Sequence, residues 1–535
     1  MPKEKTKDAV KRNKGFMLSG AAVLAIGSIV AKMLGALYRV PLTNILGAQG
    51  MGMYQLVFPV FALFMVLSTA GIPTALSRMV AEKRAEGAPT KKYLVSAILV
   101  LTALGAILAI LTFTLAGKLA QWQGNSDTRT GFMIIAPTII LVSLIAGFRG
   151  WFQGEMYMLP TAVSNIIEQV VKLAVGIGLS VALMPKGVTA AVNGALLGIA
   201  ASEAFALAYL VITYFVRGRK LKGEKLKVSR NDARTMFKVA FPIAIVAVLM
   251  PLSNFFDSII LVNVLKDSGV AQEIATAQYG LLSGPVNSLI NMPIVIIMSL
   301  AVVIVPSVSV SRVQRDIGGV MLKSRLSIKL AYLIGVPCAF YFMVFAPRLL
   351  PVIYPALTPA QLDLAVQLLR IVAANVVMLS AMQIYVSLLQ ALDRTKFAVL
   401  SLVCAITVKI ILSVVLVRYI GIAGGALASL AMAAVALAGV NIAYLKICGL
   451  HLEKNIGLNL LGGVIMALAG LGVSSLIRSN LVATIVGAAV CSAVYLWLTF
   501  LFGIVGRDEI EYLPMRRFFR TLHRIVRFWE YSDET

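Results

Sequence analysis

Long apolar stretches constrain this chain more than any other feature of its sequence. Runs of about twenty mostly uncharged residues recur along it, separated by short segments with glycine, proline or charge. A helix needs about 20 apolar residues to cross the hydrocarbon layer of a membrane. We therefore predict fourteen membrane-spanning helices, at 15–37, 51–73, 93–117, 131–150, 159–183, 189–214, 236–262, 281–307, 326–346, 366–389, 397–417, 422–445, 456–476 and 480–504.

The composition agrees with a helical membrane protein and excludes other classes. Apolar residues make up 59% of the 535 residues, charged residues only 13%, and mean hydropathy is +0.91. An ordinary soluble domain is about 45–50% apolar and 25% charged. The strands of an outer-membrane barrel would alternate apolar and polar residues, which these runs do not. The sequence therefore predicts an all-α, polytopic membrane protein.

The distribution of lysine and arginine predicts the orientation in the membrane. With the N-terminus placed inside, the inner segments hold 36 of the 48 basic residues and the outer loops hold 8. Basic residues gather on the cytoplasmic side of membrane proteins. We therefore predict that both termini are cytoplasmic. The same rule explains the net charge of +25 without a nucleic acid partner.

The longest basic loop and weak internal matches predict two similar halves. We expect a basic N-tail at 1–14, an N-lobe at 15–216, a basic linker at 217–235, a C-lobe at 236–446, two further helices at 456–504 and an amphipathic basic C-terminal tail at 507–535. A shift of 237 residues aligns Gln153 with Gln390 and Lys172 with Lys409. This pattern predicts pseudo-symmetric six-helix lobes, in the same orientation because six spans return the chain to one side.

The chain lacks the sequence patterns of catalytic and metal sites. Its only histidines, His451 and His523, lie at the predicted cytoplasmic surface, and the four cysteines lie in or at the end of apolar runs. The sequence has neither a phosphate-binding G-x-x-x-x-G-K-[ST] loop nor a G-x-S-x-G nucleophile pattern. We expect neither an enzyme nor a bound cofactor or metal.

Charged residues within the predicted spans are the best candidates for function. A charge near the membrane centre costs roughly 2.5–3.5 kcal/mol on insertion scales, so it faces a cavity or a partner. The set consists of Lys32, Glu168, Lys172, Glu203, Asp257, Arg370 and Lys409, with Arg39 just beyond the first span. Glu168 and Lys172 are four residues apart, so they can pair on one helix face.

The basic members of this set predict a cavity for phosphate, because the lysine ammonium is a compact point charge that binds phosphate. The predicted binding residues are Lys32, Arg39, Lys172 and Lys409, with Glu168, Asn165 and Asn254 as further polar groups. Structural alternatives remain open. Glu168 and Lys172 could neutralise each other, Asp257 could bridge to Lys409, and Lys32 could extend to the membrane surface.

Four segments carry a resemblance to a known family. They are KMLGALYR at 32–39, GAQGMGMY at 47–54, AGIPTALSRMVAE at 70–82 and LQALDRTK at 389–396. Together with the fourteen spans, they resemble the MOP exporter superfamily. Within it, the chain is similar to the polysaccharide-transport branch and its SpoVB- and MurJ-type flippases of lipid-linked oligosaccharides.

The resemblance implies a function. Such a protein would flip an undecaprenyl-linked pyrophosphate saccharide, such as lipid II, from the inner to the outer leaflet by alternating access. It would act in the bacterial cytoplasmic membrane for cell-wall or surface-polysaccharide assembly, with cell-wall synthesis proteins as candidate partners. The resemblance also makes Asp257 the ion-coupling candidate. It leaves open sodium, protons or the membrane potential as driving force, the glycan, a vegetative or sporulation role, and the oligomeric state.

Two other classes of function are weighed against the flippase. A cation-coupled multidrug antiporter of the related MATE branch usually has twelve spans and binds cations with carboxylates, whereas lysines dominate here. A membrane scaffold or membrane enzyme is the other alternative. Replacing Lys32 and Lys409 with methionine discriminates, because a scaffold should tolerate both changes and a flippase should stay folded but lose activity.

Overall fold

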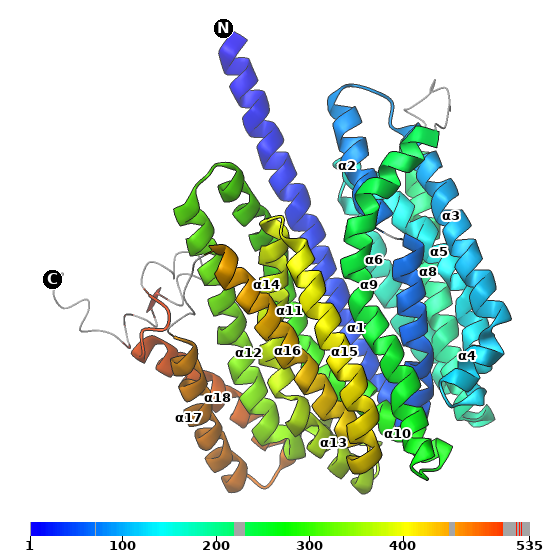
Figure 1. The fold of residues 1–535 in the computed structure, drawn as a ribbon, viewed down its shortest axis with the longest axis vertical. Coiled ribbons are helices and arrows are strands. Elements are labelled where there is room, and N and C mark those ends of the chain that lie inside the picture. Colours follow the sequence, from blue (N-terminus) through cyan, green and yellow to red (C-terminus); the bar gives the residue numbers. More distant parts are fainter. Residues whose placement is uncertain are drawn as a thin grey trace. The chain divides into compact units, whose positions relative to one another are not determined.

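The computed structural model describes residues 2–69, 71–218, 230–448, 455–506, 520, 521, 524 and 526. Within these residues the chain folds into helices joined by short turns, without a strand (Figure 1). Thirteen of the described helices are long and apolar enough to cross a membrane. The predicted all-α, polytopic architecture is confirmed.

The first two predicted spans belong to one long helix with a break inside it. Helix α1 runs from Pro2 to Thr69, and within it Gly47 alone leaves the helical conformation, at φ 66° and ψ −174°. Glycine adopts positive φ without the steric cost that a Cβ brings. The two parts of α1 correspond to two predicted spans, 15–37 and 51–73. Because α1 counts as one helix but holds two spans, the thirteen helices account for the fourteen predicted spans.

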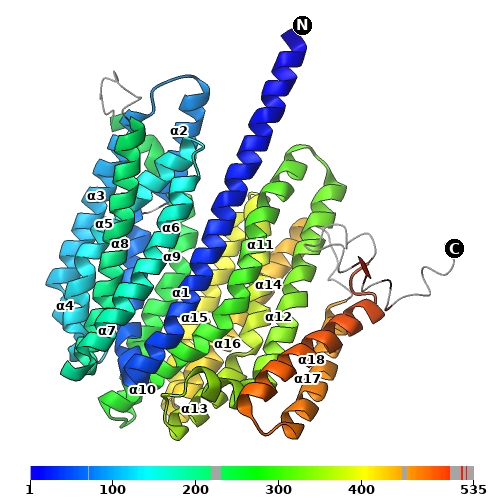
Figure 2. The ribbon, with the colours of Figure 1, turned by 180° about the vertical axis from the view of Figure 1, so that it is seen from behind.

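The other helices follow in chain order (Figures 1 and 2). Up to residue 281 they are α2 (Ile72–Ala85), α3 (Lys91–Thr114), α4 (Ala116–Trp122), η1 (Ser126–Thr128), α5 (Arg129–Gly154), α6 (Leu159–Val171), the π-helical turn η2 (Lys172–Gly176), α7 (Ile177–Leu183), η3 (Met184–Lys186), α8 (Val188–Gly218), α9 (Arg230–Asp267) and α10 (Gln272–Leu281). Then come the π-helical turn η4 (Leu282–Val286), α11 (Asn287–Val313), α12 (Ile317–Ile353), α13 (Pro359–Val372), α14 (Ala374–Ala391), α15 (Thr395–Ile420), α16 (Ile422–Cys448), α17 (Ile456–Leu476) and α18 (Asn480–Leu501).

The chain packs as two compact units, Met1–Pro285 and Val286–Thr535. The division falls inside η4, where Pro285 lacks the N–H group that a regular helix would use. The first unit therefore contains α9 and α10, which lie within or next to the predicted C-lobe at 236–446. The six-helix lobes themselves stay a prediction.

In the first unit, α1 and α10 cross in very close contact. A Cβ at Gly52 would collide with the carbonyl oxygen of Thr276, and a Cβ at Gly280 would collide with that of Ala48. Small residues at such crossings let two helix backbones approach and gain dispersion energy where no hydrophobic force drives association. A hydrogen bond also stabilises this crossing: the side-chain amide of Gln55 donates to the Ser283 carbonyl oxygen at 2.5 Å.

In the second unit, α17 and α18 pack on each other and on α12. The predicted amphipathic helix of the C-terminal tail lies almost wholly outside the described residues. Of the tail residues that are described, Val526 is buried against Phe500 and Val505, whereas Arg520 and Arg524 are exposed. The predicted position of this tail on the membrane surface stays a prediction.

The close crossing of α1 and α10 predicts a stability change. Gly52→Ala should destabilise the protein by about 1–3 kcal/mol, because the added methyl group has no room against the Thr276 carbonyl. The matched control is Gly178→Ala in α7, where a Cβ would meet open space. Thermal melts of the detergent-solubilised protein should show a lower Tm for Gly52→Ala and an unchanged or slightly raised Tm for the control. Equal melting temperatures would contradict the close packing.

Candidate functional site

A polar cavity of about 530 Å³ lies within the first unit. Helices α1, α2, α5, α6 and α8 contribute its lining. The polar side chains that line it are Ser28, Lys32, Thr69, Arg149, Gln153, Asn165, Glu168, Gln169 and Glu203. A cavity with this many charged and amide groups among membrane-spanning helices is a site for a polar ligand, since such groups are costly in lipid.

The cavity lies toward one end of the unit. Thr69 is the last residue of α1, and Gln153 stands next to the last residue of α5. Both helix ends face the cytoplasm in the predicted topology. In that predicted topology, a ligand would reach the cavity from the inner side.

A shared carboxylate organises the charges of the cavity. Arg149 of α5 places its Nη2 atom 3.1 Å from the Glu168 Oε2 atom of α6, and its Nε atom donates to the Ser164 hydroxyl at 3.0 Å. The Lys172 Nζ atom lies 3.9 Å from the other Glu168 oxygen. The predicted pairing of Glu168 with Lys172 is therefore present, but Arg149 makes the shorter contact.

An amide extends this charged group toward α1. Gln169 donates to Glu168 Oε1 at 2.9 Å and accepts from Lys172 Nζ at 3.3 Å. A Cβ at Gly35 of α1 would lie 2.9 Å from the Gln169 Oε1 atom, so α1 passes directly over this amide. Lys172 also begins the π-helical turn η2, a departure from regular helix that is frequent at functional sites.

Glu203 of α8 is the second carboxyl group of the cavity. The residue is 5% exposed and lines the cavity. Within the part of the chain that the structure describes, its carboxyl group makes neither a hydrogen bond nor an ion pair. Arg149, Glu168 and Lys172 lie near enough for their charges to act on it.

The structure brings only part of the predicted binding set together. Lys32, Asn165 and Glu168 line the cavity, and Lys172 adjoins it through Glu168. Lys409 is buried in α15, in the second unit.

The other predicted residues occupy different places in the first unit. The Arg39 guanidinium lies over the Phe58 ring, 5.7 Å from its centroid. Asn254 is exposed, and Asp257 is half-buried with its charge near Tyr279. None of these three residues lines the cavity of the first unit, so their functional roles stay predictions.

Arg149 and Gln153 line the cavity but are not among the predicted site residues. The span predicted at 131–150 places Arg149 at its cytoplasmic end, whereas α5 continues to Gly154. The apolar pair Trp151 and Phe152, both buried, was the signal that the helix goes on. Glu203 was noted as a charge in a span but was not assigned to the site, because nothing in one sequence places α8 beside α6.

Hydrogen bonds close the opposite end of the same unit. Gln123, just after α4, donates to the Ser258 hydroxyl of α9 at 2.8 Å, and Asn125 donates to the Thr276 hydroxyl of α10 at 3.1 Å. Lys266 of α9 donates to the Gly124 carbonyl at 2.8 Å. These bonds tie the loop at 118–130, predicted to be external, to α9 and α10; we call them the outer clasp.

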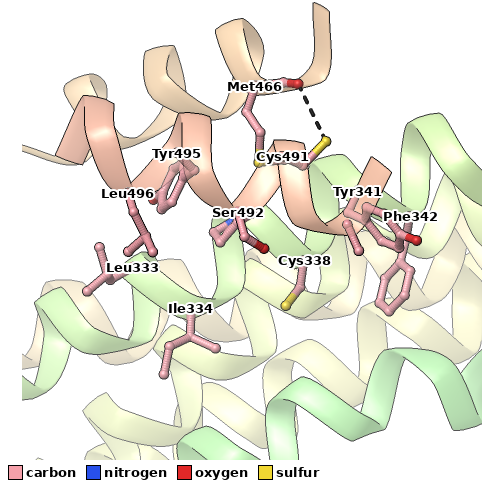
Figure 3. A pocket seen from close by; sticks show the side chains of 12 residues that line it. Leu333, Ile334, Cys338, Tyr341, Phe342, Met466, Cys491, Ser492, Tyr495 and Leu496 are labelled. Atoms are coloured by element: carbon pink, nitrogen blue, oxygen red, sulfur yellow. Dashed lines mark hydrogen bonds between the residues drawn. The ribbon is translucent and has the colours of Figure 1, made fainter. Parts of the chain in front are cut away.

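A second, apolar cavity of about 360 Å³ lies in the second unit (Figure 3). It lies between α12, which supplies Leu333 and Cys338, and α18, which supplies Tyr495 and Leu496. The hydroxyl of Tyr495 is hydrogen-bonded to Asn459 at 3.0 Å. This lining suits a hydrocarbon chain rather than a charged group.

The Arg149–Glu168 pair predicts an energetic coupling that can be measured. Their side chains are only 21% and 17% exposed, so removing one partner leaves a poorly solvated charge. A double-mutant cycle with Arg149→Met and Glu168→Gln should give a coupling energy of about 1–3 kcal/mol in thermal or denaturant unfolding. The control cycle is the Arg78–Glu82 pair, whose side chains are 70% and 57% exposed and which should give about 0.5 kcal/mol or less. A cavity pair no stronger than the exposed pair would refute this arrangement.

Comparison with known proteins supplies relatives for the whole chain. Stage V sporulation protein B of Bacillus subtilis (strain 168) is 28% identical over 516 residues, which cover 94% of this chain and 98% of that protein. The Lipid II flippase MurJ of the same organism is 23% identical over 442 residues, covering 77% of this chain and 79% of that protein.

Solved structures show the same fold. A Lipid II flippase MurJ in an inward closed conformation superimposes with a TM-score of 0.72 at 14% identity, covering 90% of this chain and 98% of that one. An inward-facing MATE family multidrug resistance transporter of the MOP superfamily gives a TM-score of 0.66 at 15% identity, with 80% and 98% covered. The family described as "Polysaccharide biosynthesis protein" matches residues 17–312, more than half of the chain. The chain therefore belongs to this polysaccharide biosynthesis protein family.

Proposed function

We propose that this protein flips a lipid-linked saccharide from the inner to the outer leaflet and holds the phosphate groups of the cargo in the cavity of the first unit. The observation that carries the proposal is the group of three cations, Lys32, Arg149 and Lys172, within or beside a polar cavity among membrane-spanning helices. The chain is a transport protein rather than an enzyme, in line with relatives named as flippases and transporters.

The energetics of the cargo explain why such a cavity is needed. Moving an ionised headgroup through bare hydrocarbon costs tens of kcal/mol by Born estimates. Cations and amides in a protein cavity replace the water that the phosphates lose. Lys32 and Arg149 can donate to phosphate oxygens, and Asn165 and Gln153 can hydrogen-bond sugar hydroxyls.

The lipid tail of the cargo has different requirements from the headgroup. A prenyl chain is apolar and can stay in the surrounding hydrocarbon while the headgroup crosses. The apolar cavity between α12 and α18 has the chemistry to receive part of such a chain.

Alternating access supplies the path. The cavity lies toward the predicted inner end of the first unit, and the outer clasp closes the opposite end. Such an arrangement supports loading from the inner leaflet in the proposed cycle. Release on the outer side then requires the clasp bonds to break, with the loop at 118–130 separating from α9 and α10.

Lipid II is the cargo that we propose to test first. The name of a relative, Lipid II flippase MurJ, supports this choice, and the name Stage V sporulation protein B supports a role in sporulation. A pyrophosphate diester next to a prenyl chain is common to such precursors. The cavity therefore fits the class, and the flipping experiment identifies the member.

The structural likeness to a MATE family transporter favours a second candidate, cation-coupled export of drugs. Most such drugs are organic cations, and a cavity for them needs an excess of negative charge. Here Lys32, Arg149 and Lys172 outnumber Glu168 and Glu203. The sign of the cavity charge therefore favours an anionic cargo.

The flippase proposal predicts a loss of transport when a cavity cation is removed. In proteoliposomes with fluorescent lipid II, wild-type protein should speed exposure of the headgroup to a membrane-impermeant reagent. Lys32→Met should slow it about tenfold, because one charge contact to phosphate is worth about 1.4 kcal/mol or more. The matched control is Lys118→Met in α4, an exposed lysine outside the cavity, which should flip at the wild-type rate.

The outcomes separate the candidates. Loss of transport in folded Lys32→Met, with normal transport in Lys118→Met, supports the flippase. If folded wild-type protein leaves lipid II in place, the same assay with a teichoic-acid or capsule precursor follows. Failure with every prenyl-linked glycan, together with uptake of an organic cation, would replace the flippase by the drug antiporter.

A further inference from the structure

We propose that Glu203 binds a proton when the cavity binds its anionic headgroup, so that proton and headgroup are held and released together. The proposal deepens the function proposed above and rests on it. It assigns to Glu203 a role in adjusting the cavity charge to that of the cargo.

The position of Glu203 is unusual for an ionised carboxylate. It is 5% exposed, lies in the middle of α8 and lines the cavity, yet it makes neither a hydrogen bond nor an ion pair within the described residues. Its neighbour Glu168, by contrast, is paired with Arg149 at 3.1 Å and with Lys172 at 3.9 Å. A buried carboxyl group without a partner relieves the cost of its charge by taking up a proton.

Some of the charged groups that face Glu203 favour its ionised form, and another favours its neutral form. Helix α8 packs against α1, α5, α6, η2, α7 and η3. These elements present Lys32 from α1, Arg149 from α5, Glu168 from α6 and Lys172 from η2. Helix α7 has no titratable residue, and Lys186 of η3 is exposed at the other end of the unit. Cations favour the ionised form of a carboxyl group, and burial and Glu168 favour the neutral form.

The sum of the cavity charges shows what the proton would do. The three cations Lys32, Arg149 and Lys172 face the two carboxylates Glu168 and Glu203, which leaves one positive charge when both carboxylates are ionised. A proton on Glu203 raises this to two positive charges. A pyrophosphate diester has one negative charge on each phosphate, so the protonated cavity neutralises it completely.

Because of this charge match, proton binding and headgroup binding are thermodynamically coupled. If a proton raises the affinity for the headgroup, the headgroup must raise the affinity for the proton by the same factor. The proton then travels outward with the headgroup and lowers the charge that crosses the membrane. An acidic inner compartment should therefore speed outward flipping, and an acidic outer compartment should slow it.

Equilibrium binding tests the proposal directly. The probe is a synthetic prenyl pyrophosphoryl N-acetylglucosamine, whose phosphates stay ionised from mildly acidic to mildly alkaline pH. The affinity of full-length wild-type protein in nanodiscs should fall about tenfold across this range, as expected for one charge interaction at a distance of several ångströms. Glu203→Gln, a neutral mimic of the protonated form, should bind tightly at both pH values.

The matched control is Glu273→Gln in α10, an exposed glutamate without a hydrogen bond or ion pair in the described chain; it should keep the wild-type pH dependence. A second measurement does not depend on the folding of any variant. At the pH where the affinity of wild-type protein changes most steeply, addition of the probe in weakly buffered solution should take up about half a proton for each probe bound, the most that a tenfold linkage allows.

The outcomes distinguish the two proposals. Binding of the probe without proton uptake, or a pH dependence that persists in folded Glu203→Gln, overturns the role of Glu203 and leaves the flippase intact. Faster flipping with an acidic outer compartment also overturns it, because the proton would then move inward. If wild-type protein neither binds the probe nor flips any prenyl-linked glycan, both proposals fall together.

Discussion

One carboxylate that serves two cations determines the character of the first unit. Glu168 accepts from Arg149 at 3.1 Å and lies 3.9 Å from Lys172, so three charges from α5, α6 and η2 share a single site inside the membrane-spanning bundle. Without Glu168, the two cations would repel each other among poorly solvated helices, which would destabilise the unit. With it, one cation is neutralised and the other is left for a ligand. The cavity can therefore exist as a stable, charged space.

The sequence predicts the spans better than it predicts the site, for a physical reason. Whether a segment enters the lipid depends mainly on the hydrophobicity of its own residues. A hydrophobic run can therefore be recognised from sequence alone, and each predicted span corresponds to a helix. The pairing of Glu168 with Lys172 was also predictable, because it depends only on spacing along one helix. Arg149 and Glu203 lie on other helices, and their approach depends on how α5 and α8 pack against α6, which no local pattern records. The position of the break at Gly47 is an intermediate case, since glycine permits positive φ but only packing selects which glycine adopts it.

Packing at the two ends of the first unit differs in kind. At the cavity end, charged and amide side chains keep helices apart around a space. At the other end, Gly52 and Gly280 let α1 and α10 touch through their backbones, and the outer clasp adds side-chain hydrogen bonds such as that of Gln123 to Ser258. Hydrogen bonds within membrane proteins average below about 1 kcal/mol. A few such bonds hold the end closed without making its opening prohibitive, which suits the opening step of the proposed transport cycle.

The fold alone does not decide what crosses the membrane, because a flippase and a drug transporter share it. The sign of the cavity charge is what favours the proposed flippase over a drug transporter. A bundle that is selected to expel organic cations would place unpaired carboxylates against the ligand and keep lysine away. Here Glu168 is paired with two cations, and the buried Glu203 is the proposed site of a proton. Both features increase the positive charge that a ligand meets. With three cations against at most two ionised carboxylates, the cavity has a net positive charge whether or not Glu203 is protonated, so its electrostatics favour the anionic headgroup of the proposed cargo.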